Sequence, residues 1–197
     1  MRRFAFIAVV ALQVIVLLLM AGSRAAIVSS GQEILLKAEP VDPRHPFMGD
    51  YVRLSYNISN IDLRLVSTDI AEENFDYGSK VYVVVEDQRG LYHAVGLYQK
   101  EPAAAPGQVV LQGRYDGFHD QEPSARDPLA APLEKDPVRD GRPKFARIEY
   151  GLEEYYLPEG KGLELEQTLR EQKNLYARVK VWRGDSVLTG LVQAESL

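Results

Sequence analysis

Three side chains that can bind a polar ligand, Asp50, Arg53 and Tyr56, stand close together in the stretch GDYVRLSY at residues 49–56. An arginine guanidinium binds carboxylate or phosphate groups through two parallel hydrogen bonds. A carboxylate accepts hydrogen bonds, and a phenol both donates and accepts them. These residue types predict a binding site for a polar ligand, with Asp50, Arg53 and Tyr56 as its candidate residues.

The alternation of the same stretch supports a second interpretation. Gly-Asp after a proline-rich segment is typical of a turn, and residues 51–58 alternate between apolar and polar as in a strand with one buried face. This pattern places Tyr56 on the apolar face and Arg53 on the opposite one. Asp50 would then bond turn amides, Tyr56 would pack in the core, and Arg53 would be the residue that faces solvent or a partner.

Two other groups of side chains have types found in metal and catalytic sites: the acids Glu149, Glu153, Glu154 and Glu159, and the histidines His45, His93 and His119. The acids lack the tightly alternating oxygen ligands of a calcium loop, and the histidines lack the close ligand pair of a zinc site. The chain contains no cysteine. The sequence therefore predicts no metal, no cofactor and no catalytic set, and it favours a protein that is not an enzyme.

The N-terminus has the composition of a membrane anchor. Residues 4–22 carry no charge and follow Arg2 and Arg3. As a helix they would span roughly 28 Å, close to the ~30 Å hydrocarbon core of a bilayer. We predict an anchor over residues 1–25, with residues 4–22 in the lipid. A cleaved signal is the alternative, because residues 22–26 are mostly small, but the apolar core of such signals has only about 7–15 residues.

The charge distribution predicts which side of the membrane the rest of the chain occupies. Arg2 and Arg3 favour a cytoplasmic N-terminus, so the C-terminal part would lie outside the cytoplasm. Without these two residues and Arg24, the chain keeps 20 of its 23 basic residues and all 28 acidic ones, a formal charge of −8. This acidic excess opposes binding to nucleic acid.

After the anchor, residues 31–197 have the pattern of a single β-rich domain. Short runs rich in β-branched and aromatic residues alternate with turn residues, which is typical of an antiparallel sheet. Strands are predicted over residues 33–38, 51–58, 80–86, 91–98, 108–115, 144–151, 175–182 and 186–192. We predict a mainly β fold, an antiparallel sandwich or a partly closed barrel behind an N-terminal transmembrane helix.

Three local features complete this prediction. Residues 87–90 are expected to form a four-residue hairpin loop. Residues 116–143 contain recurrent prolines and are expected to form a long loop inside the domain. Residues 163–172 contain good helix formers and predict a short C-terminal helix.

The residues Gly49, Asp50, Tyr51, Leu54 and Tyr56 fit the pattern G-D-Y-x-x-L-x-Y, and the chain resembles the bacterial GDYXXLXY protein family. The segments DPR at residues 42–44 and YYLPEG at residues 155–160 support the resemblance, as does the single N-terminal span. The family has no established activity. The resemblance implies a bacterial cell-envelope protein with one pass through the inner membrane, a periplasmic C-terminal domain and a multi-pass membrane protein as partner.

Two functions are therefore expected from the sequence. The first is a non-catalytic, membrane-anchored module that binds a membrane protein. The alternative is an envelope enzyme or small-ligand receptor that uses Asp50 and Arg53, with the loop at residues 116–143 as its lid.

Overall fold

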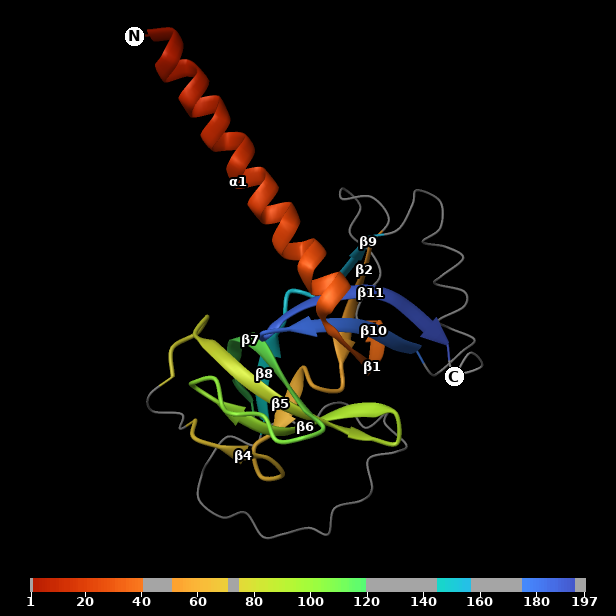
Figure 1. Ribbon diagram of the computed structural model, residues 1–197. Coiled ribbons are helices and arrows are strands. Elements are labelled where there is room, and N and C mark those ends of the chain that lie inside the picture. Colours follow the sequence, from red (N-terminus) through yellow and green to blue (C-terminus); the bar gives the residue numbers. More distant parts are fainter. Residues whose placement is uncertain (1, 41–50, 71–74, 120–144, 157–174, 194–197) are drawn as a thin grey trace.

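The computed structural model describes residues 2–40, 51–70, 75–119, 145–156 and 175–193. Within them the chain forms one helix and eleven strands (Figure 1). The elements are α1 (Arg2–Ser30), β1 (Gln32–Pro40), β2 (Tyr51–Tyr56), β3 (Asn60–Asp62), β4 (Ser67–Thr68), β5 (Lys80–Gln88), β6 (Leu91–Tyr98), β7 (Gln108–His119), β8 (Phe145–Glu149), β9 (Glu154–Tyr156), β10 (Leu175–Trp182) and β11 (Asp185–Gln193).

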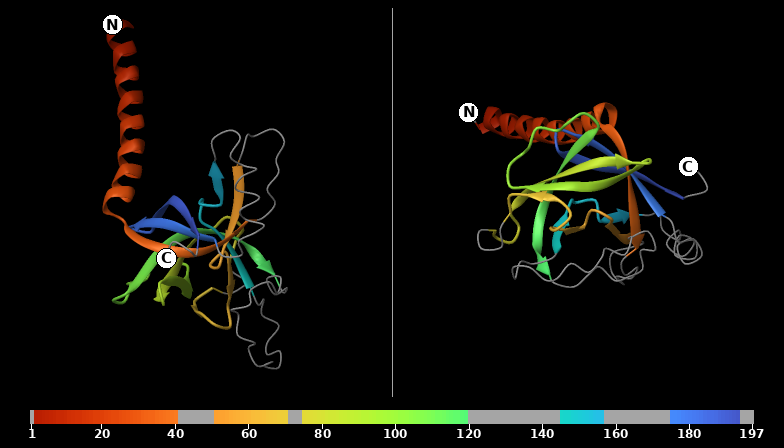
Figure 2. Two further views of the ribbon diagram at one scale, coloured as in Figure 1. Left: turned by 90° about the vertical axis from the view of Figure 1, so that its right-hand side faces the viewer. Right: turned by 90° about the horizontal axis from the view of Figure 1, so that it is seen from below.

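The strands form two sheets around one core. Their orders are β11-β10-β1-β2-β9 and β3-β8-β7-β5-β6-β4, and neighbouring strands are antiparallel except for the short pair β4–β6. The strands curl around the core as a half-barrel (Figure 2). The sheets meet where the Gln112 amide donates to Gly184 O at 2.8 Å. The predicted mainly β fold with a partly closed barrel is confirmed.

Alternation along the strands builds the core. In β10, the buried residues Leu175, Ala177, Val179 and Val181 alternate with more exposed ones. β1 pairs with β10 in antiparallel register and adds buried side chains from the same face. An apolar face of this kind is stable only when a second layer covers it, and the six-stranded sheet does so.

Both long hairpins turn on two residues with positive φ, Arg89 and Gly90 (61° and 89°) and Arg183 and Gly184 (53° and 84°). Such turns match the right-handed twist of the strands that they join. The four-residue loop predicted between β5 and β6 is wrong, because β5 continues for two more residues. Asp87 instead stabilises the tight turn by accepting a hydrogen bond from the Gly90 amide at 2.7 Å.

The predicted proline-rich loop also begins too early, because β7 continues to His119. At Tyr115 the register with β8 shifts, and Gly117, with a φ of 118°, accommodates the bulge. Residues 120–143 of the predicted loop and the predicted helix at residues 163–172 lie outside the described residues. In the part of the chain that is described, α1 is the only helix.

Helix α1 extends eight residues beyond the predicted apolar span. It stands away from the half-barrel, and only its C-terminal end reaches the strands (Figures 1 and 2). Its contacts with the strands are mainly to β10 and β11. By length and composition it is a candidate membrane span, and a signal sequence shares these properties.

Candidate functional site

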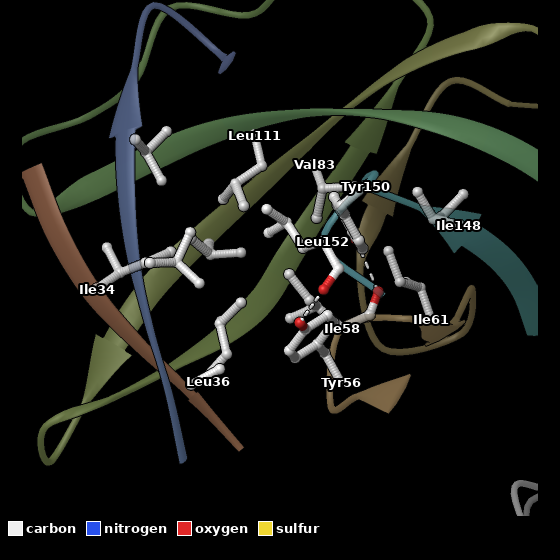
Figure 3. Close-up of a cluster of buried hydrophobic side chains, with 14 of the residues drawn as sticks. Ile34, Leu36, Tyr56, Ile58, Ile61, Val83, Leu111, Ile148, Tyr150 and Leu152 are labelled. Carbon is white, nitrogen blue, oxygen red and sulfur yellow. Dashed lines mark hydrogen bonds between the residues drawn. The ribbon is translucent and has the colours of Figure 1, made fainter. Parts of the chain in front are cut away.

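The motif strand β2 directs Tyr56 into the core. Leu54 and Tyr56 are 1% and 3% exposed, so these two motif residues pack as the alternation predicts. The Tyr56 hydroxyl donates to Leu152 O at 2.5 Å (Figure 3). Burial, with a smaller contribution from the charge of Glu153, raises the pKa of Tyr56 well above its ordinary value. Tyr56 is therefore a structural residue here and is not exposed to a ligand.

A second tyrosine makes the reciprocal connection. Tyr150, the residue after β8, donates its hydroxyl to Ile58 O at 2.7 Å, while the Tyr56 hydroxyl bonds to the segment after Tyr150 (Figure 3). Both accepting carbonyls belong to residues outside the strands. We call Tyr56 and Tyr150 the tyrosine clasp, because together they join the turn after β2 to the segment between β8 and β9.

Ser59 completes the turn that the clasp holds. Its hydroxyl accepts a hydrogen bond from the Tyr56 amide at 3.0 Å, and its carbonyl accepts one from the Ile148 amide at 2.9 Å. Because an unsatisfied buried backbone group costs free energy, these bonds explain how the chain can turn inside the protein.

Arg53 points to the opposite face of β2, as predicted. Its guanidinium Nη2 lies 3.4 Å from Glu149 Oε1, and the two side chains are 57% and 43% exposed. An ion pair so open to solvent contributes little to stability, typically below ~1 kcal/mol. Arg53 is thus free to exchange Glu149 for an acidic group of a partner at small cost.

Arg53 and Glu149 belong to a row of polar side chains that also contains Arg147, Asp116 and Tyr77. We call these five residues the polar strip. Arg147 lies 4.0 Å from Asp116, and a hydrogen bond to the Asp116 side chain raises the pKa of Tyr77. The signs of the charges alternate along the strip. This pattern is electrostatically complementary to a surface that carries both acidic and basic groups.

An open cavity of about 280 Å³ lies at the Asp116 end of the polar strip. Its lining residues are Asp116, Gly117, Phe118, His119 and Arg147. The sequence did not single out Asp116 or Arg147, because their proximity depends on the bulge at Gly117 and on the pairing of β7 with β8. No local sequence signal reports that register.

Among the residues that the structure describes, the other candidates do not form a second site. Asp50, His45 and Glu159 lie outside the described residues. Glu153 accepts a hydrogen bond from the Tyr150 amide at 2.6 Å, so this acid has a structural role. Among the described residues, no group of three or more His, Cys, Asp or Glu side chains is placed to hold a metal ion.

The C-terminal end of α1, residues 24–30, packs on the folded domain, and we call it the foot of α1. Ile27 is only 4% exposed, and Arg24 Nη1 donates to Ser186 O of β11 at 3.3 Å. The Gly31 amide donates to Ile27 O at 2.8 Å. A Cβ atom at Gly31 would collide with Ile27 O and would lie 3.1 Å from Val181 O, so only glycine fits this junction.

A comparison with family models identifies one relationship. The model described as GDYXXLXY protein matches residues 13–191, which includes most of α1 and all the strands except the last residues of β11. No curated protein and no solved structure matches the chain.

Proposed function

The chain belongs to the GDYXXLXY family, whose function is not established, and from this premise we propose that it is a membrane-anchored module that binds another membrane protein and catalyses no reaction. It would lie in the bacterial inner membrane with its β domain outside the cytoplasm. Arg2 and Arg3 ahead of the apolar span support this orientation.

Retention of α1 is the first step of the argument. The apolar span exceeds the core of a typical cleaved signal, and the last turns of the helix pack on the domain through Ile27 and Arg24. Cleavage in the small residues 22–26 would cut the helix within this contact and would remove Arg24 or leave it at a frayed end. The foot of α1 therefore acts as a structural element as well as a linker.

The observation that carries the proposal is the direction of β2 and β9. The start of β2 and the end of β9 project to the same side of the half-barrel as α1 (Figures 1 and 2). If α1 crosses the bilayer, this side faces the membrane. Arg53, the third residue of β2, then lies where the chain could meet a neighbouring membrane protein.

The chemistry of the described motif residues supports binding over catalysis. Leu54 and Tyr56 pack in the core, and Arg53 is exposed and forms a weak ion pair with Glu149. Charged pairs at the rim of an interface steer association and determine partner choice. The polar strip supplies such charges from β2, β7 and β8.

We expect the mature protein to keep its N-terminal helix. Intact-mass measurement of protein extracted from membranes should give the mass of the full chain, because the anchor is not removed. A chain that begins between residues 22 and 27 would contradict anchoring by α1.

We expect the full-length protein to co-purify with a membrane protein in mild detergent. Replacing Arg53 with alanine should lower the recovery of that partner by about tenfold, equivalent to ~1.4 kcal/mol, because interface arginines often contribute this much. The melting temperature should change little, because the Arg53–Glu149 pair is solvent-exposed.

Arg64→Ala is the matched control. Arg64 is also exposed and paired with an acid, Asp62, but it precedes β4, at the end of the domain far from α1 (Figure 1). Partner recovery should be unchanged in this variant. Purification of the wild-type chain alone, as a monomer, would refute the binding proposal even if α1 is retained.

A further inference from the structure

The β10–β11 turn lies beside the foot of α1, and a hydrogen bond fixes its position there. Arg24 Nη1 donates to the carbonyl of Ser186, the second residue of β11. We call residues 182–185, which contain this turn, the hairpin tip. The tip is also held from the other side, because the Gln112 amide of β7 donates to Gly184 O.

The length of α1 gives the depth of the hairpin tip relative to the bilayer. Residues 4–23 of a helix span roughly 30 Å, the thickness of the hydrocarbon core. Arg24 then lies at the outer boundary of the core, and the helix continues for about 10 Å to Ser30. The headgroup layer on each side is roughly 5–8 Å thick. Since Arg24 reaches Ser186, the hairpin tip lies at or next to this layer.

The side chains of the hairpin tip suit a phospholipid headgroup. Trp182 is the only tryptophan in the chain and is half-buried. The guanidinium carbon of the exposed Arg183 lies 4.7 Å from the centre of the Trp182 ring. Tryptophan is enriched at membrane interfaces, and an arginine donates to phosphate oxygens in a bidentate manner.

The local charge has the opposite sign to that of the whole chain. Residues 24–33 and the β10–β11 hairpin contain four basic side chains and two acidic ones. The basic residues are Arg24, Arg178, Lys180 and Arg183, and the acidic residues are Glu33 and Asp185. Glu33 pairs with both Arg178 and Lys180, at 3.4 and 3.5 Å, so Arg183 is not neutralised by it. This surface attracts phosphate although the chain has a net charge of −5.

We propose that the hairpin tip is a second membrane contact, in which Trp182 and Arg183 bind the phosphate-bearing headgroups of the bilayer that α1 crosses. With two contacts, the helix and the tip, the half-barrel is held at a fixed orientation to the membrane. This inference rests on the proposed function only in requiring that α1 stays in the membrane.

Quenching of Trp182 fluorescence tests the contact in the full-length protein. The protein is reconstituted into phosphatidylcholine–phosphatidylglycerol vesicles that carry a nitroxide either on the headgroup or near the bilayer centre. We expect the headgroup nitroxide to remove most of the Trp182 emission and the deep nitroxide to remove little. Arg183→Asn, which tolerates the positive φ of this turn, should reduce quenching by the headgroup nitroxide.

A displaced tryptophan provides the matched control. In the double variant Trp182→Phe, Leu65→Trp, the probe replaces an exposed leucine (60%) just before β4, far from α1 (Figure 1). Neither nitroxide should quench it. Flotation of the vesicles separates the two proposals. Protein that floats while Trp182 escapes headgroup quenching overturns the membrane contact alone, and protein that does not float overturns the anchor and the contact together.

Discussion

Replacing Tyr56 with alanine is expected to lower the free energy of unfolding of the domain by roughly 3–5 kcal/mol, the range seen for buried aromatic residues. The side chain is 3% exposed and packs in the core that both sheets share. The variant loses this packing and also leaves Leu152 O without its donor. The measurement is urea denaturation in detergent micelles, followed by Trp182 fluorescence.

Tyr56→Phe separates the two contributions. It keeps the ring and removes only the hydroxyl, so the expected loss is ~1–3 kcal/mol for the carbonyl left unsatisfied in the core. Tyr77→Phe is the control. Tyr77 is 77% exposed, so removing its hydroxyl should change the free energy of unfolding very little. If Tyr56→Phe were as stable as the wild type, the hydrogen bond of the clasp would have no structural role.

The clasp also predicts that Tyr56 and Tyr150 depend on each other. Each hydroxyl donates to the chain segment next to the other tyrosine, namely to the residue two positions after it. Loss of one bond loosens the segment that carries the other. The double variant Tyr56→Phe, Tyr150→Phe should therefore cost less than the sum of the two single variants.

The inward direction of Tyr56 was predictable from the sequence, because alternation at a period of two is a local property of the strand. Its hydrogen-bond partner was not predictable. Leu152 is 96 positions away, and the bond forms only when β2 and β9 pair and the segment after β8 folds back. Alternation predicts which side of a strand is buried, but it does not predict which distant carbonyl will accept the hydrogen bond of the tyrosine hydroxyl.

The errors in the predicted strands have the same origin. Turn-forming residues predicted a loop over residues 87–90. The hairpin turns only on Arg89 and Gly90, because pairing with β6 extends β5 to Gln88. Likewise, residues 116–119 were assigned to the proline-rich loop, but in the folded chain Gly117 accommodates a bulge that lets β7 continue alongside β8. Pairing with a neighbour overrides local propensity in both cases.

The candidate site was predicted only in part. The pattern correctly placed Arg53 on the exposed face, because only the polarity of its own strand was needed. The polar strip joins residues of β2, β7 and β8 with Tyr77 from the segment before β5, and no spacing in the sequence brings these together. The third predicted residue, Asp50, lies outside the described residues and stays a prediction.

Above about pH 10, the stability of the domain is expected to fall steeply because of the tyrosine clasp. Burial, and secondarily the charge of Glu153, raises the pKa of both Tyr56 and Tyr150 above the ordinary value. Below that ordinary value both tyrosines are protonated in the folded and the unfolded chain, so their contribution to stability is fully present. Above it the unfolded chain releases protons that the folded chain retains, which favours unfolding.

The expected slope is about 1.4 kcal/mol per pH unit for each buried tyrosine, and about 2.7 for the pair, until the raised pKa values are reached. Urea denaturation at intervals between about pH 9 and pH 12 measures this slope. Lysines and exposed tyrosines titrate in the same range, so the comparison with Tyr150→Phe isolates the clasp. This variant is less stable at neutral pH because it lacks the bond to Ile58 O, yet its stability should fall by about 1.4 kcal/mol less per pH unit than that of the wild type. Equal slopes in the two proteins would show that Tyr150 ionises in the folded domain as readily as in water, which its burial in the core opposes.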